Sequence, residues 1–188
     1  MSREPVVFEL ASVKRDRFDS LRFTLTRVVK KNYWFSGSYT RSRSWSDSLL
    51  DFDLDTIVFG HAGGGPLAWD VPHRFLGWGW VAMRHKLELS SSIDWRSGFP
   101  YSVVNGYQQL VGRANGSRFN DYFAINVHVE RRFRFANYEC AFRVGVNNLT
   151  NHPNPGVINN NIDSPNFLQR RGIEDRSVVG RIRFLGKK

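Results

Sequence analysis

The sequence contains few of the features that identify small secreted, metal-binding or helical membrane proteins. Cys140 is the single cysteine among 188 residues, which excludes an intrachain disulfide and a cysteine-rich metal site. No run of about 18 apolar residues is present, and the mean hydropathy is -0.41, so the chain does not cross a membrane with helices. Cys140 falls among apolar residues in the strand phase described below, and we expect a buried, unreactive thiol.

The N-terminus lacks the pattern of a secretory signal. The first ten residues, MSREPVVFEL, are charged early and have no apolar core of roughly 7–15 residues before a small-residue cleavage site. Taken alone, this pattern predicts a cytoplasmic protein. Taken with the strand pattern below, it suggests that the start of a larger protein is missing.

Aromatic residues and positive charge are abundant. The chain has 6 Trp, 6 Tyr and 15 Phe, and its formal net charge is +10 at pH 7. A strongly basic protein attracts anionic partners, which here include nucleic acid, phosphorylated lipid and acidic ligands. Composition alone does not choose among these three.

Asp121 to Thr150 has the clearest pattern in the chain. Apolar residues alternate with Ala, Asn, His and Glu from Phe123 to Glu130, and the alternation resumes from Tyr138 to Asn147. A period of two places alternate side chains on opposite faces of a β-strand. The segment therefore predicts a β-hairpin that turns near Ala136-Asn137. Its arms approach the roughly 9–11 residues with which a tilted strand crosses a bilayer, so its apolar face meets either lipid or a protein core.

Similar strands are predicted along the rest of the chain, with no convincing helix. We expect about eight or nine strands in an all-β, antiparallel up-and-down meander. Besides the hairpin above, the predicted strands are Pro5–Val13, Ser20–Val28, Tyr33–Ser42, Val71–Met83, Leu87–Trp95, Tyr101–Val104 and Ser177–Phe184. The segment Lys14–Asp19 is expected to be a charged connection.

Short and long connections alternate between these strands. The short turns are expected at Lys30–Asn32, Arg84–Lys86 and near Ala136, and the long polar loops at Arg43–Asp70, Gln108–Asn120 and Asn151–Arg176. Tight turns at one end and long loops at the other are typical of a bacterial outer-membrane β-barrel. Aromatic residues near strand ends fit the interfacial girdles of such a barrel, although ordinary core packing explains them equally well. These residues are Tyr33, Trp34, Phe75, Trp95, Phe99, Tyr101, Tyr122, Phe133, Phe135, Tyr138 and Phe184.

No catalytic, cofactor or metal site is predicted. Asp51, Asp53 and Asp55 have the spacing of a calcium loop, but Thr56 and Ala62 replace its glycine and glutamate, so a solvated loop is expected. The triplet Gly63–Gly65 is not followed by the Lys-Ser/Thr of a phosphate-binding loop. The five histidines have no metal-ligand spacing; they are His61, His73, His85, His128 and His152.

Two sets of basic residues are expected to face different surroundings. Arginines on the polar strand faces would line the lumen of a barrel or be exposed on a soluble sheet; they are Arg22, Arg143, Arg181 and Arg183. Arginines in loops would contact the phosphates of lipopolysaccharide or keep the loops soluble; they are Arg113, Arg118, Arg170 and Arg171.

Five segments, in order, resemble one protein family. They read FDSLRFTLTRVVKKNYWFSGSYTRSRS, WDVPHRFLGWGWV, LSSSIDWRSGFPYSVVNG, GRANGSRFNDYFAINVHVERRFRF and FRVGVNNLTNHPNP. The chain beyond Arg17 resembles the C-terminal part of the β-barrel of TonB-dependent outer-membrane receptors, of the type with a carboxypeptidase-regulatory-like N-terminal domain. Each motif is moderately specific, and their common order strengthens the resemblance.

The resemblance implies a function and a set of partners. The family's receptors are 22-stranded barrels with an N-terminal plug, and they take up scarce ligands when TonB pulls on the plug. Residues 1–188 would then be the C-terminal segment of such a barrel, with plug and N-terminal strands absent, located in the outer membrane and not competent alone. Its partners would be outer-membrane lipid and lipopolysaccharide, the rest of the receptor, and TonB through the plug; nucleic acid is not among them.

A binding module is the alternative. A soluble, basic β-sandwich or barrel that holds nucleic acid or another polyanion would also explain the charge and the interleaved aromatic residues. The alternation of basic residues along almost every strand favours the membrane interpretation, because nucleic-acid readers gather such residues on one patch. Nothing in the sequence indicates an enzyme.

Overall fold

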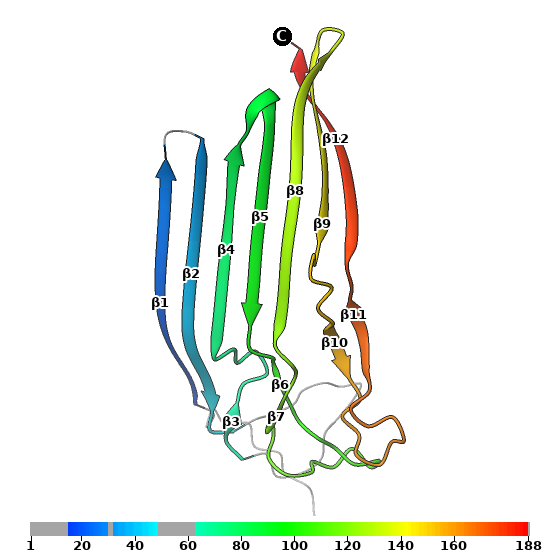
Figure 1. Cartoon of the computed structure of the whole chain (residues 1–188). Helices are drawn as coiled ribbons and strands as arrows, with labels where there is room; N and C mark the ends of the chain where they lie inside the picture. The colour runs from blue at the N-terminus through cyan, green and yellow to red at the C-terminus, as the bar shows by residue number, and fades with distance from the viewer. Residues whose placement is uncertain (1–14, 30–31, 49–62, 188) are drawn as a thin grey trace, which may run out of the picture.

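One antiparallel sheet dominates the computed structural model, which describes residues 15–29, 32–48 and 63–187. Its long strands follow chain order, β1-β2-β4-β5-β8-β9-β12, and every neighbouring pair is antiparallel (Figure 1). They are β1 (Asp16–Val29), β2 (Tyr33–Ser46), β4 (His73–Ala82), β5 (Leu87–Arg96), β8 (Tyr122–Phe135), β9 (Tyr138–Asn147) and β12 (Ser177–Lys187). The predicted all-β, up-and-down antiparallel architecture is confirmed; within the described residues the sheet stays open, with β1 and β12 as its edges.

The two ends of the sheet differ. The turns that join β4 to β5 and β8 to β9 lie at one end, which we call the turn end (Figure 1). A one-turn 3₁₀ helix, η1 (Arg84–Lys86), makes the first of these turns, and Ala136, with φ 49°, makes the second. The longer connections gather at the opposite, loop end (Figure 1). The predicted separation of short and long connections is therefore present among the described residues; Lys30 and Lys31 of the third expected turn and residues 49–62 of the loop expected at Arg43–Asp70 lie outside them.

The long connections have structure of their own. The two-residue β3 (Gly65–Pro66) pairs with the end of β2. In the loop after β5, β6 (Pro100–Tyr101) pairs with β7 (Ser117–Arg118), and between β9 and β12, β10 (Asn154–Ile158) pairs with β11 (Arg170–Glu174). The predictions of uninterrupted loops at Gln108–Asn120 and Asn151–Arg176 were wrong to this extent. The strand predicted at Tyr101–Val104 is shorter, and Val104 makes only isolated bridges.

Several strands are longer than their hydrophobic alternation predicts. β1 begins at Asp16, so the expected connection Lys14–Asp19 is partly strand, and Asp16–Asp19 pair with Arg43–Ser46 of β2. β2 accordingly continues to Ser46, inside the expected loop Arg43–Asp70. Backbone hydrogen bonds between β1 and β2 therefore extend both strands beyond their apolar residues and into charged segments. The expected strand Pro5–Val13 and the acidic loop at Asp51–Asp55 lie outside the described residues.

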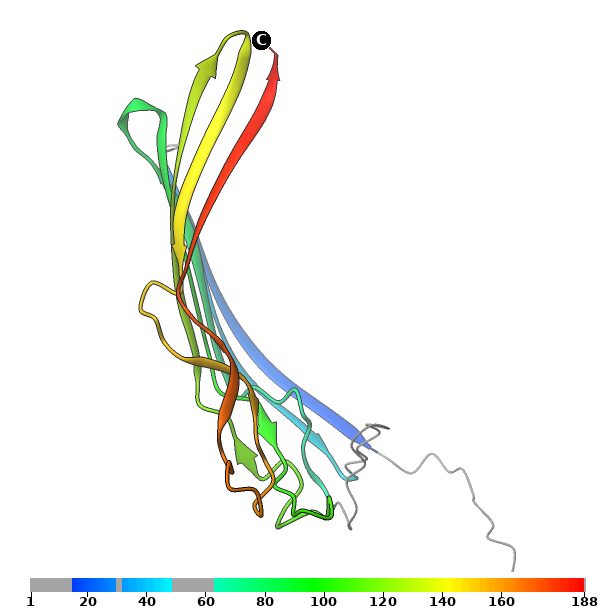
Figure 2. The same ribbon diagram turned by 90° about the vertical axis from the view of Figure 1, so that its right-hand side faces the viewer.

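The sheet is a single curved layer with almost no core. In side view, the described elements cover neither face of the long strands (Figure 2). The buried hydrophobic residues of the described chain are Leu67, Val104, Ala114, Ala124, Cys140 and Ala141. Most of these are small, whereas Phe23, Leu25 and Ile182 are more than half exposed. Apolar area that stays in water contributes none of the roughly 25 cal/mol per Å² that stabilises a folded core, so the sheet needs another apolar neighbour.

Within the described segments, no helix has the length and apolarity needed to cross a membrane.

Candidate membrane interface and loop-end sites

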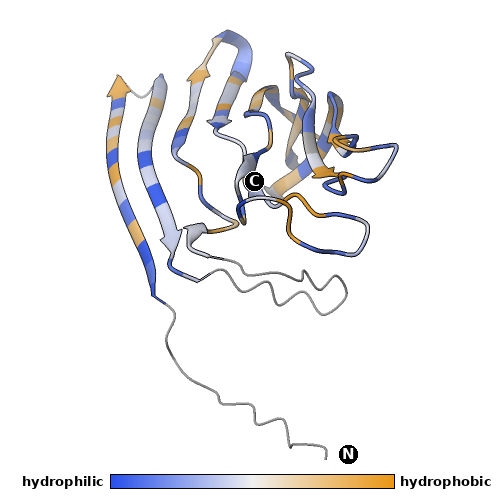
Figure 3. Cartoon of the chain, turned by 90° about the horizontal axis from the view of Figure 1, so that it is seen from below, coloured by the Kyte–Doolittle hydropathy of each residue, from blue (hydrophilic) through white to orange (hydrophobic). Residues whose placement is uncertain are grey.

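One face of the sheet is apolar across all seven long strands. Antiparallel register places side chains from neighbouring strands in rows, and one row contains Phe23, Tyr39, Phe75, Trp95 and Phe123. Another row, nearer the turn end, contains Val29, Tyr33, Val81, Leu89, Val129, Val144 and Gly180. Seen from below, β1 shows the alternation of hydrophilic and hydrophobic residues that produces the two faces (Figure 3). We call this surface the apolar face and the opposite surface the polar face.

The boundary of the apolar face runs obliquely across the strands. On β1 the apolar residues of this face begin at Leu21, after Asp19. On β2, β4, β5 and β8 they begin in the single row Tyr39, Phe75, Trp95 and Phe123, level with Phe23, and on β9 and β12 they begin in the row Val146 and Val178. Followed through the registers of the intervening strands, Val178 of β12 lies in the same row as Val127 of β8 and Arg27 of β1. Arg27 is six positions along β1 from Leu21. The boundary therefore shifts by two residues between β1 and β2, stays level as far as β8 and shifts by four residues at β9, which averages about one residue per strand over the six steps from β1 to β12.

A shallow hollow interrupts the apolar face over β2 and β4. Gly37, Gly77 and Gly79 all belong to the apolar phase of their strands and leave a cavity of about 610 Å³. Its other lining residues include Phe23, Leu25, Phe35, Tyr39, Phe75 and Ile93. Sequence reasoning missed this hollow, although three glycines in one strand phase were a visible signal.

Hydrogen bonds and ion pairs cross the polar face. Thr26 and Ser36 hydroxyls lie 2.8 Å apart, and Asn126 donates to Ser92 at 3.1 Å. Arg74 donates to Asp94 at 3.3 Å. Polar side chains on a sheet face that has no covering layer satisfy one another or water. This face therefore suits an aqueous space, whereas the other suits an apolar one.

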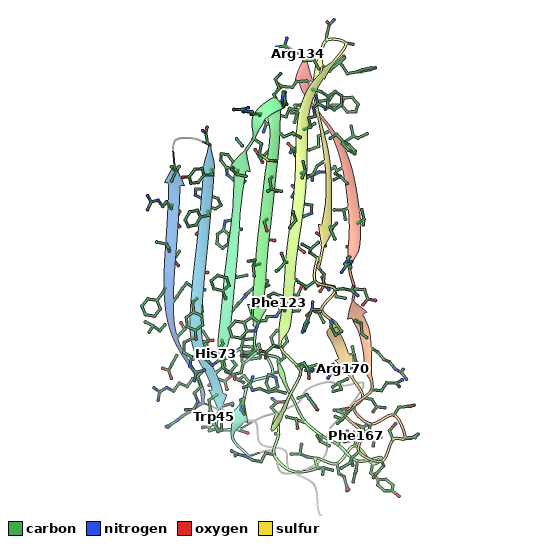
Figure 4. All side chains as sticks on the ribbon, viewed as in Figure 1. Trp45, His73, Phe123, Arg134, Phe167 and Arg170 are labelled. Carbon is green, nitrogen blue, oxygen red and sulfur yellow. The ribbon has the colours of Figure 1, made fainter. Side chains whose placement is uncertain are left out.

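A buried ion pair holds the loop end together. Asp70, whose side chain is 4% exposed, accepts the Ser44 amide at 2.5 Å and pairs with Arg118. Arg118 also donates to the carbonyl oxygens of Asp70, at 3.0 Å, and Gly98, at 3.1 Å. Arg118, predicted to contact lipopolysaccharide or solvent, is thus occupied by contacts within the chain. Two other predicted basic loop residues, Arg170 and Arg171, are exposed at the start of β11; the side chain of Arg170 is labelled in Figure 4.

A small pocket of about 200 Å³ lies where β5 and β8 meet the loops. The Arg96 guanidinium stands 4.2 Å from the centre of the Tyr122 ring and 5.3 Å from that of Phe99. The Tyr122 hydroxyl donates to Glu174 of β11 at 3.1 Å. Tyr122 lies on the loop side of the apolar rows, and desolvation, reinforced by Glu174, raises the pKa of its phenol above the usual value. The hydroxyl therefore remains a donor at neutral pH.

Asparagine side chains attach the β10–β11 hairpin to the main sheet. Asn154 accepts the amide of Phe123 at 2.9 Å and donates to the carbonyl of the same residue at 3.0 Å, so it imitates a paired strand. Asn148, with φ 50°, donates to the carbonyls of His152, at 2.8 Å, and Glu174, at 3.0 Å. Phe123 is labelled at the lower end of the strands in Figure 4.

The sequence-predicted residues do not converge on one site. Arg22, Arg143, Arg181 and Arg183 all lie on the polar face, as the alternation predicts. Cys140 is buried as expected. The predicted aromatic residues lie near strand ends, but Trp34 and Tyr122 are in the polar phase of their strands and are not part of an aromatic belt on the apolar face. Among the described residues, no group of three or more His, Cys, Asp or Glu side chains is arranged to hold a metal.

No family model, curated protein or solved structure matches the chain.

Proposed function

We propose that this chain forms part of the wall of a transmembrane β-barrel, in a bacterial outer-membrane receptor for TonB-dependent uptake. The oblique boundary of the apolar face carries the proposal. A membrane surface cuts every strand at one height, so tilted strands enter it at successively shifted residues. A soluble sheet packed on a protein core has no such requirement.

The size of the shift fits strands that cross a bilayer. The average shift of one residue, about 3.3 Å, per strand spacing of about 4.8 Å corresponds to a mean tilt of about 35°. Transmembrane barrel strands tilt by roughly 35–45°. The apolar phase of β9 runs from Tyr138 to Val146. Those residues span about 26 Å along the strand and about 22 Å along the membrane normal, close to the roughly 25 Å apolar band of outer-membrane barrels.

Closure of the barrel requires additional strands. The seven long strands alternate in direction, so β1 and β12 run the same way. Direct pairing of these edges, within one chain or between copies around a common axis, would give a parallel ladder. An all-antiparallel barrel therefore needs an odd number of strands in addition to these seven. Unpaired edges are not tolerated in hydrocarbon, because every backbone polar group there needs a partner.

The receptor assignment rests on the ordered motifs, supplemented by the structured loop end. In this proposal the remaining barrel strands and the plug belong to the same receptor, and TonB acts through that plug. The apolar face contacts lipid, and acyl chains fill the hollow over Gly37, Gly77 and Gly79. The polar face lines the lumen, and exposed loop residues such as Arg170 and Arg171 meet lipopolysaccharide.

The soluble, polyanion-binding alternative is less well supported. Arginine residues occur at both ends of the sheet and on the polar face, and do not form a single patch. That alternative also leaves the apolar face in water, with Phe23 63% and Ile182 63% exposed.

Lipid quenching of a fluorescent label tests the orientation of the sheet. In a Cys140→Ala background, a single cysteine replaces Val127, on the apolar face, or its neighbour Asn126, on the polar face, and carries an environment-sensitive label. After reconstitution, together with the remaining strands of the proposed receptor, into vesicles containing brominated phospholipid, we expect strong quenching at position 127 and weak quenching at position 126. Equal quenching at both positions, or folding of the full chain without detergent or lipid, would overturn the membrane proposal.

The receptor assignment needs a separate test in cells. The chain is expressed together with its upstream coding region, and the outer-membrane fraction is analysed with and without heating. We expect a heat-modifiable band of larger mass that crosslinks to TonB. A band in the outer membrane without the TonB crosslink would support a barrel but contradict TonB-dependent uptake.

A further inference from the structure

Two arginines face each other across neighbouring strands of the polar face. Arg143 of β9 and Arg181 of β12 are direct partners in the antiparallel register. Like charges directly opposite each other destabilise a sheet. Arg143 donates weakly to Ser90 at 3.5 Å, and Arg181 has no hydrogen bond or ion pair to any described residue.

The nearby acidic charge does not neutralise this pair. Glu130 of β8 lies beside Arg143 in the register, but Arg183 donates to both of its carboxylate oxygens at 2.5 Å. Arg132 approaches the same carboxylate at 3.9 Å. Glu88 of β5 lies directly opposite Glu130 and is the second carboxylate of this row, so two carboxylates face the four arginines Arg132, Arg143, Arg181 and Arg183, and positive charge remains in excess.

The arginine pair borders a cavity whose base is closely packed. The cavity has a volume of about 290 Å³ and is lined by His128, Arg143, Val179, Gly180 and Arg181. Between His128 and Val179 lies Gly145, where an added Cβ would fall 2.1 Å from Cδ2 of His128. The imidazole therefore lies directly over the glycine backbone. Gly180 contributes only backbone to this cavity, because its side-chain position projects on the apolar face.

We propose that this cavity binds a phosphoryl group between Arg143 and Arg181. Guanidinium groups offer paired N–H donors that match phosphate oxygens, and a doubly charged anion offsets the repulsion of two arginines. The His128 ring supplies a third polar contact on the β8 side. The cavity exceeds the size of a free phosphate, so the shared chemistry includes inorganic phosphate and small phosphate esters. The inference does not depend on membrane insertion, because it uses only the register of three adjacent strands.

Titration calorimetry on the full chain folded in detergent micelles tests this site. The probes are inorganic phosphate, glycerol 3-phosphate and acetate, at constant ionic strength in chloride. We expect saturable binding of phosphate, at least tenfold weaker binding of acetate, and at least a tenfold loss of phosphate affinity in Arg143→Gln and in Arg181→Gln. The matched control, Arg170→Gln, removes the same charge from an exposed strand of the loop end and should retain wild-type affinity.

Thermal unfolding provides a second readout that does not require calorimetric heat. Arg181→Gln removes the repulsion, so it should unfold at a temperature equal to or above that of the wild type without phosphate, and should lose the stabilisation by phosphate.

Tighter binding of glycerol 3-phosphate than of phosphate identifies an ester as the ligand, and the reverse order identifies the free anion. Absence of saturable phosphate binding, equal binding of acetate, or an equal loss in Arg170→Gln overturns the proposal. The quenching experiment above is unaffected by any of these results.

Discussion

Asp70 and Arg118 form an ion pair between two loops that are 48 residues apart in sequence. The Asp70 carboxylate is almost fully buried and also accepts the backbone amide of Ser44, at the end of β2. Arg118 belongs to β7 and reaches the carbonyl of Gly98 as well. One side-chain pair thereby fixes the positions of a strand end and of both neighbouring connections.

Replacement of Arg118 by glutamine should loosen the loop end and leave the strands folded. The substitution leaves a buried carboxylate without its cation, which typically costs 3–5 kcal/mol; since a third of the Arg118 side chain is exposed, we expect a loss of about 2 kcal/mol. Hydrogen exchange should accelerate in residues 98–119 and stay unchanged in β8. Arg170→Gln serves as the control, and an unchanged exchange rate in residues 98–119 would show that the ion pair is dispensable.

Gly145→Ala should be far more destabilising than Gly180→Ala, although the two glycines lie on the neighbouring strands β9 and β12. A Cβ at position 145 would lie 2.1 Å from the His128 ring and 2.6 Å from the Val127 carbonyl oxygen, whereas position 180 is open. We expect a cost of about 3 kcal/mol for Gly145→Ala and about 0.5 kcal/mol or less for Gly180→Ala in urea unfolding of the lipid-reconstituted chain.

A His128→Ala substitution added to Gly145→Ala should recover only part of this loss. The double variant removes the imidazole contact but keeps the clash with the Val127 backbone. If the double variant had the wild-type free energy of unfolding in the same urea titration, the clash would be entirely with the imidazole. If it were no more stable than Gly145→Ala, the clash would be entirely with the backbone.

Leu25→Arg and Thr24→Arg should separate the two faces of β1. Leu25 is 67% exposed on the apolar face, and Thr24 projects on the opposite face. An arginine on the lipid side near the bilayer centre costs about 2–4 kcal/mol, whereas one on the lumen side is tolerated. Folding yields into vesicles, measured by protease protection, should fall for Leu25→Arg alone. If Leu25→Arg instead gave a more soluble folded chain, the apolar face would not contact lipid.

Asn154→Ala should release the β10–β11 hairpin from β8. The asparagine occupies both backbone groups of Phe123, and the loss of such bonds from a part-buried position costs about 1–3 kcal/mol. The Phe123 amide should exchange faster with deuterium, while the neighbouring Phe123–Trp95 register stays intact. Asn166→Ala, in the exposed loop between β10 and β11, provides the control.

The sequence predicted the parts of this fold that depend on local alternation. The hairpin of β8 and β9, the assignment of Arg143 to the polar face and the turn at Ala136 all follow from a period of two. The extension of β1 back to Asp16 was not predictable, because Asp16–Asp19 are extended through backbone pairing with Arg43–Ser46, and their own residue types do not favour strand.

The sites depend on contacts between distant residues, and the sequence pattern does not contain them. The Asp70–Arg118 pair, the Asn154 bonds to Phe123 and the Arg143–Arg181 pairing each join segments at least 31 residues apart. Each requires the register of strands or the path of a loop, neither of which follows from residue periodicity. The glycines under the apolar hollow, Gly37, Gly77 and Gly79, were visible in the predicted strand phases, but their pairing across β2 and β4 was not.

Val104 connects two loops that would otherwise be separate. It is 2% exposed, and it bridges Leu110 in its own loop and Asn161 in the loop between β10 and β11. The carbonyl of Asn160 accepts the Val104 amide at 3.0 Å, and the Val104 carbonyl accepts the amide of Ile162 at 2.8 Å. Val104 therefore joins the two loops at the loop end, and a displacement of the exposed Tyr107 would be transmitted through Val104 to the loop between β10 and β11.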